Sequence, residues 1–191
     1  MGDDYEMFKG RPDSPLRVGG YLEKDAAFAE LDCSEHFAKV FDQIGFTAYD
    51  DHMLAQISEL MQAAPSTVDF QFDVYPGGAL GDMFSLEVKF GAARTELVHE
   101  SFANGPGARI MHLLESWGIA DERWKLGVEA TLARTVPVEL PNGTEERFAF
   151  IIMPQWVKVR WRGARLQPAK LYHVADAGPV PYGERAASAH R

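Results

Sequence analysis

The sequence predicts an α+β protein in which helices pack on one face of a mostly antiparallel sheet. Apolar residues recur at three- and four-residue steps in the first third of the chain and again around residue 110, a spacing typical of amphipathic helices. In several later segments apolar and polar residues alternate, which is typical of half-buried strands. Most of the alternating segments are joined by turns too short for a parallel crossover, so we expect antiparallel pairing.

Two helices are predicted in the first third of the chain. The first covers 25–44, with an interruption near Cys33, and Gly45 ends it. The second follows Asp50, whose carboxylate can cap a helix N-terminus, and keeps its apolar spacing until Pro65.

A third helix and three pairs of strands are predicted in the rest of the chain. The helix runs from Pro106 to Gly118, and one further turn is expected at 121–125. Residues 91–105 are expected to be irregular. Asn142-Gly143 is a strong hairpin signal between two of the strands. The strands are expected over 68–74 and 84–90, over 136–140 and 147–153, and over 156–161 and 168–174.

The composition predicts one folded domain over 21–174. Of the 191 residues, 46% are hydrophobic and 25% are charged, as in globular proteins with a buried core. Residues 1–20 hold many glycines and prolines, so we expect an extended lead-in, and 175–191 have the composition of a disordered tail. No apolar run is long enough for a membrane helix, and the first residues are acidic. We therefore expect a soluble, cytoplasmic protein with no membrane partner.

Charge is distributed unevenly along the chain. The net charge is -9, and residues 1–62 hold thirteen acids against five bases. Residues 147–175, in contrast, hold six bases and no acid. The negative total argues against a nucleic-acid partner. The basic segment fits either a solvated face or a site for an anionic, carboxylate-rich partner.

The chain shows no catalytic or cofactor-binding signature, and we expect no cofactor. Glycine motifs that bind phosphates or dinucleotides are missing, and the single Cys33 excludes a disulfide framework. The best candidates for chemistry are His99, His112 and Glu115, of which the last two share a helix face at a spacing found in carboxylate metal sites. A small enzyme acting on peptide, a cyclase or a metal-assisted oxidase, is therefore the alternative to a binding protein.

One predicted hairpin, over 156–174, combines aromatic and basic side chains. Strand alternation turns one tryptophan and two cations away from the core-facing Val157 and Val159. Arginine and aromatic residues are enriched where proteins bind partners, and an extended peptide can also add to a strand edge. The residues that we expect to bind a peptide are Trp156, Lys158, Arg160, Arg162, Lys170 and Tyr172.

The same hairpin has a structural interpretation. Lysine and arginine on exposed strands protect sheet edges from aggregation, and their methylene groups cover aromatic surface. A tryptophan beside them can then be only a cation–π brace. Single-stranded nucleic acid also binds cations next to aromatic rings, but the net charge argues against that ligand.

Four segments between Phe84 and Tyr172 resemble a known family. They are Phe84–Phe90 (FSLEVKF), Arg109–Gly118 (RIMHLLESWG), Pro154–Trp161 (PQWVKVRW) and Pro168–Tyr172 (PAKLY). Between Phe84 and Ala175 the chain is similar to the peptide-binding proteins of crocagin biosynthesis, which belong to ribosomal-peptide natural-product clusters. The resemblance implies a protein that binds a precursor peptide and assists its modification into a pyrroloindoline-type alkaloid.

The sequence and this resemblance together predict non-catalytic binding of a ribosomally made precursor peptide. We expect Trp156 and Tyr172 to be apolar anchors, and the neighbouring cations to contact carboxylates or backbone carbonyls. The expected partners are the peptide and a modifying enzyme of the same pathway. A homodimer, in which exposed strands pair with a second copy, is a further alternative.

Overall fold

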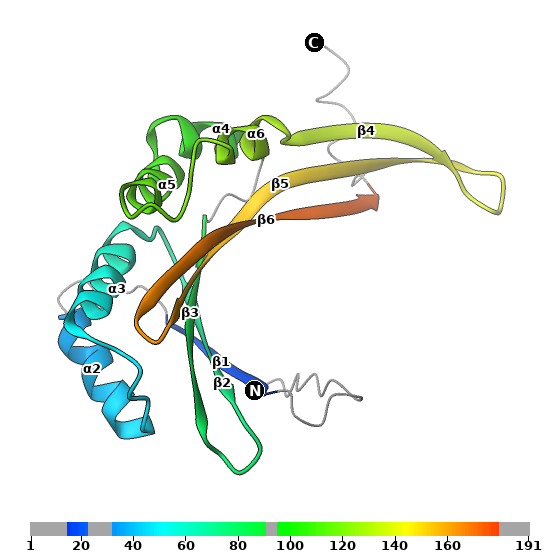
Figure 1. Ribbon diagram of the computed structural model, residues 1–191. Helices are drawn as coiled ribbons and strands as arrows, with labels where there is room; N and C mark the ends of the chain where they lie inside the picture. Colours follow the sequence, from blue (N-terminus) through cyan, green and yellow to red (C-terminus); the bar gives the residue numbers. More distant parts are fainter. Residues whose placement is uncertain (1–14, 23–31, 91–94, 180–191) are drawn as a thin grey trace.

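A computed structural model describes residues 15–22, 32–90 and 95–179 of the chain and confirms the α+β class (Figure 1). Its helices are α2 (Cys33–Ile44), α3 (Asp51–Ala63), α4 (Thr95–Asn104), α5 (Pro106–Ser116) and α6 (Trp124–Glu129). Its strands are β1 (Leu16–Leu22), β2 (Val68–Val74), β3 (Leu80–Lys89), β4 (Leu132–Glu139), β5 (Glu145–Arg162) and β6 (Arg165–Pro179). Among the described residues, no helix combines the length and the apolarity needed to cross a membrane.

All the strands belong to one antiparallel sheet. The order is β1-β2-β3-β5-β4, and β6 also pairs with β5. β5 has two parts: residues 156–162 pair with β3, and residues 145–152 pair with β4. Its other edge pairs with β6 from residue 148 to residue 162. The sequence predicted two strands where β5 is continuous. Pro154 does not interrupt β5 because it lies beside a bulge, where a strand tolerates the missing N–H.

The ends of the first two helices follow from their capping residues. Asp32 accepts a hydrogen bond from the Glu35 N–H at 3.1 Å, and Asp50 accepts one from Met53 at 2.8 Å. Gly45, at a φ of 75°, ends α2 as predicted. Residues 25–31 of the first predicted helix lie outside the described residues.

The core lies between the helices and one face of the sheet, which we call the inner face. Phe84, Val159 and Trp161 are fully buried there among helix side chains. Phe41 of α2 packs against Phe84 and three other phenylalanines at centroid distances of 5.0 to 5.9 Å. The indole Nε1 of Trp161 donates a buried hydrogen bond to Gln56 of α3 at 2.9 Å. The packing on the inner face therefore holds β5 in place. The alternate side chains of β5 point to the opposite face of the sheet, which we call the outer face.

The predicted domain boundaries differ from the structure at both ends. Residues 16–20 of the expected lead-in belong to β1, and 175–179 of the expected tail belong to β6. β1 contains two glycines at positions where the neighbouring strand β2 leaves no room for a Cβ atom. A Cβ on Gly19 would overlap the Phe70 carbonyl oxygen, and one on Gly20 would lie 2.8 Å from the Phe70 ring. The rest of the lead-in and tail, 1–14 and 180–191, lies outside the described residues.

Candidate binding surface

The strand register brings the six predicted binding residues together on the outer face of β5 and β6. Directly paired residues of neighbouring strands lie on the same face of a sheet, which also adds Arg165, a residue that the sequence analysis did not include. The pairs are Trp156 with Tyr172, Lys158 with Lys170, Arg160 with Gln167, and Arg162 with Arg165.

Trp156 and Tyr172 form a stacked aromatic pair at one end of this group. Their ring centroids lie 5.3 Å apart and their planes differ by 14°. Both side chains are half-buried, so each keeps part of its surface exposed to solvent. Their stacking provides a flat apolar platform beside the basic residues of the same strands.

The indole N–H of Trp156 is the exception among the four tryptophans of the chain. The other three donate to side-chain oxygens: Trp117 to Glu59 at 3.3 Å, Trp124 to Glu115 at 2.8 Å, and Trp161 to Gln56 at 2.9 Å. Nε1 of Trp156 is buried and has no acceptor among the described residues. A buried donor without a partner costs about 1–3 kcal/mol, so this site favours an acceptor that the described residues do not supply.

Arg160, on the same strand, also has a buried donor group without a partner in the described part of the chain. Its Nε is buried and has no hydrogen-bond partner among the described residues. Arg162, Arg165 and Lys170 are exposed and form no ion pair within the described part of the chain. The β5–β6 part of the outer face therefore carries four basic side chains whose charge no carboxylate of the described residues balances.

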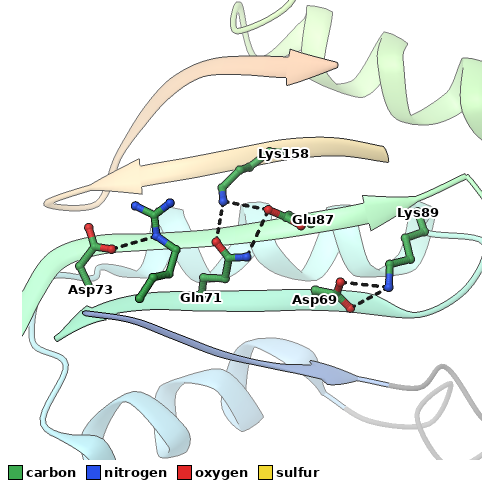
Figure 2. A network of polar contacts seen from close by, with 7 residues as sticks. Asp69, Gln71, Asp73, Glu87, Lys89 and Lys158 are labelled. Carbon is green, nitrogen blue, oxygen red and sulfur yellow. Dashed lines mark hydrogen bonds and ion pairs between the residues drawn. The ribbon is translucent and has the colours of Figure 1, made fainter. Parts of the chain in front are cut away.

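Lys158 differs from the other predicted residues because its charge is already compensated. The residue is only 6% exposed, and Nζ donates to Oε1 of Gln71 and, at 2.8 Å, to Oε1 of Glu87 (Figure 2). Gln71 in turn donates to Glu87 at 3.2 Å. Lys158 is thus a buried structural cation, and we no longer include it among the residues that contact a ligand.

The β1–β3 part of the outer face is also internally paired. Arg17 of β1 contacts Asp73 at 3.1 Å, and Lys89 of β3 contacts Asp69 at 3.0 Å (Figure 2). These pairs and the Lys158 network leave Arg17, Lys89 and Lys158 each paired with a carboxylate of the chain. The surface available to an anionic ligand is therefore the β5–β6 part, on and around Trp156 and Arg160.

Two of the three residues proposed for an enzyme, His112 and Glu115, have structural contacts. Glu115 accepts a hydrogen bond from Trp124 at 2.8 Å through one oxygen and contacts His112 Nδ1 at 2.9 Å through the other. These contacts join α5 to α6. His99 is an exposed residue of α4. No group of three or more histidine, cysteine or acidic side chains that could hold a metal ion occurs within the described ranges.

Glu115 gives the α5–α6 contact a pH dependence. Hydrogen bonds from His112 and then Trp124 lower the pKa of Glu115. A lowered folded-state pKa gives stability that is complete above the ordinary glutamate pKa and is lost as the pH falls through the folded value.

The variant Glu115→Gln should therefore melt at a lower temperature than wild type at neutral pH, and the difference in Tm should shrink on acidification. Thermal melts over an acid series test this, with Glu129→Gln at the exposed end of α6 as control. A constant difference contradicts it.

A cavity of about 560 Å³ lies on the inner side, between α5, α6 and the β5–β6 pair. Its walls are mainly apolar and include Met111, Trp124, Val157 and Leu171. His173 is held at its edge by a 2.9 Å hydrogen bond between Nε2 and the Gly127 carbonyl. No sequence pattern indicates this cavity, because it forms between segments far apart in the chain.

Similarity to known proteins does not identify this surface. Comparison with family models gave no match, and comparisons with curated proteins and with solved structures gave none either. The function is therefore inferred from the chemistry of the β5–β6 part of the outer face.

Proposed function

We propose that this protein binds an extended, acidic peptide on the β5–β6 part of its outer face and carries out no chemistry on it. The main support for this proposal is a pair of buried hydrogen-bond donors, Trp156 Nε1 and Arg160 Nε, that have no acceptor among the described residues. A peptide supplies carbonyl and carboxylate acceptors, and a hydrogen bond that involves a charged group, such as the Arg160 guanidinium or a peptide carboxylate, is worth about 1.5–3 kcal/mol. The stacked rings of Trp156 and Tyr172 add apolar contact.

The separation of the two donors favours an extended ligand over a small anion. Trp156 and Arg160 are four residues apart on β5, which corresponds to roughly 13 Å along a strand. A single phosphate or amino acid cannot satisfy both positions, whereas an extended peptide offers an acceptor at each residue. Arg162, Arg165 and Lys170 surround this line and attract acidic side chains.

Binding requires local side-chain movement. Nε1 of Trp156 and Nε of Arg160 are both buried in the unliganded chain, so an acceptor reaches them only when neighbouring side chains shift. Tyr172 is the neighbour stacked on Trp156, and we expect its ring to move when peptide binds. Rotations of this kind are common when side chains enter an interface.

The class of peptide follows from the resemblance given above. A ribosomally made precursor peptide is extended before it folds or is modified, and it offers both backbone acceptors and side chains to a strand surface. We propose that the protein holds such a precursor and thereby assists its modification into a natural product, with a modifying enzyme as the second partner.

A fluorescence anisotropy titration tests the proposal with a labelled synthetic peptide of alternating glutamate and valine. We expect saturable binding that weakens at least tenfold in the double variant Trp156→Phe, Arg160→Met, because tenfold corresponds to about 1.4 kcal/mol and two donors are lost. Arg17→Met is the matched control, since Arg17 lies on the same face but is paired with Asp73. It should bind as wild type does.

Two further probes separate the alternatives. A peptide with lysine in place of glutamate should bind at least tenfold more weakly, because it brings like charge to the basic residues. An oligothymidylate of similar length should also bind more weakly than the acidic peptide. If the double variant binds the acidic peptide as tightly as wild type does, or if the protein prefers the lysine peptide or the oligonucleotide, this surface is not a site for an acidic peptide.

A further inference from the structure

The β4–β5 hairpin and the end of β6 form an arm that projects away from the helices (Figure 1). We define the arm as residues 132–152 and 174–179. Residues 145–152 of β5 pair with β4, and residues 148–152 also pair with β6 on the other side, so most of the arm is three strands wide. The arm therefore presents two faces, and each is set by alternate side chains of its strands.

One face of the arm is apolar and exposed. Leu132 is 47% exposed, Phe150 41% and Ile152 39%. Val136, Val138 and Phe148 continue the same face and are half-buried. On β6 the residues paired with this face are small or apolar, namely Ala175, Ala177 and Pro179. No described element covers this surface, and an apolar face of this kind marks an interaction site.

Two charged residues lie within this apolar face and are complementary. Arg134 lies opposite Phe150 in the strand register. On this face it is the next residue of β4 from Val136 towards the base of the arm. Glu146 lies opposite Val138 in the strand register. On this face it is the next residue of β5 from Phe148 towards the tip of the arm. Neither residue forms an ion pair among the described residues. The positive and negative positions are thus equally spaced on either side of Val136 and Phe148.

We propose that two copies of this chain associate through these faces, with their arms antiparallel about a two-fold axis at the level of Val136 and Phe148. This rotation places Arg134 of one copy over the Val138–Glu146 level of the other, and the reverse contact forms at the same time. Sheets stack about 10 Å apart, a gap that arginine and glutamate side chains span together. The apolar residues of both arms are then buried against each other.

This inference is independent of the proposed peptide site, which lies on β5–β6 beyond the arm. It is tested by the mass of the wild-type protein over a concentration series in sedimentation velocity. We expect a concentration-dependent dimer. Arg134→Glu and Glu146→Arg should each weaken dimerisation at least tenfold, because each places like charges opposite one another. The double variant should restore it.

Two more variants give the hydrophobic contribution and its control. Phe150→Asp on the apolar face should yield a monomer, whereas Thr135→Asp on the opposite face of the same arm should leave the dimer unchanged. Circular dichroism checks that each variant is folded. A wild-type monomer at every concentration, or a charge-exchanged double variant no better than the singles, overturns the proposed association.

Discussion

Replacing Trp161 by alanine is expected to lower the free energy of unfolding by about 4 kcal/mol, in the range measured for large aromatic side chains removed from cores. Trp161 is fully buried, lies 5.9 Å from the Phe84 ring, and donates to the buried Gln56. The substitution leaves a cavity under β5 and an unpaired acceptor on α3. Urea denaturation followed by circular dichroism measures the loss.

Two comparison variants separate packing from hydrogen bonding at this position. Trp161→Phe keeps most of the packing and loses the donor to Gln56, so we expect a loss of about 1–2 kcal/mol. Leu126→Ala removes a side chain that is 63% exposed on α6 and should change stability by about 0.5 kcal/mol or less. If Trp161→Ala costs no more than Leu126→Ala, Trp161 does not fix β5 to the helices.

Replacing Glu87 by glutamine is expected to cost about 3 kcal/mol, because it leaves the Lys158 ammonium buried without a negative partner. The Lys158 and Glu87 side chains are only 8% and 17% exposed, so solvent does little to screen the uncompensated charge. The double variant Glu87→Leu, Lys158→Met removes both charges and should regain most of the stability. Guanidinium unfolding of the single and double variants measures the coupling.

The neighbouring surface pair is the control for this effect. Lys89→Gln breaks the Lys89–Asp69 contact, in which both side chains are more exposed, at 46% and 26%. We expect a cost of about 1 kcal/mol or less. Equal costs for Glu87→Gln and Lys89→Gln contradict the conclusion that Lys158 is a buried structural residue and return it to the candidate binding set.

The helices and hairpins with clear local signals were predictable from the sequence. Asp50 and Gly45 mark helix ends in the structure, and Asn142-Gly143 forms the β4–β5 turn. Helix α4 was wrongly expected to be irregular. Between Val98 and Phe102, its two buried apolar residues, the spacing is a single helical step, which is too little periodicity to predict a helix. Its stability comes from packing, including contact of Phe102 with Phe90 at 4.7 Å.

The outer-face residues were predictable, but their charge balance was not. Strand alternation correctly separated Trp156 and Arg160 from the core residues Val157 and Val159. Alternation alone cannot identify the neighbouring strand, and the compensation of Lys158 depends on Glu87 lying opposite it on β3. That no described residue accepts a hydrogen bond from Trp156 Nε1 or Arg160 Nε is likewise visible only once the neighbouring strands are placed.

The most direct test of peptide binding on the outer face is the indole N–H region of a two-dimensional ¹⁵N NMR spectrum. The four tryptophans give four indole signals, and three of these groups already donate within the protein. On titration with the acidic peptide, we expect the Trp156 signal to move downfield as its N–H gains an acceptor, while the Trp117, Trp124 and Trp161 signals stay in place. Saturation by the peptide with the Trp156 signal unmoved contradicts the proposal.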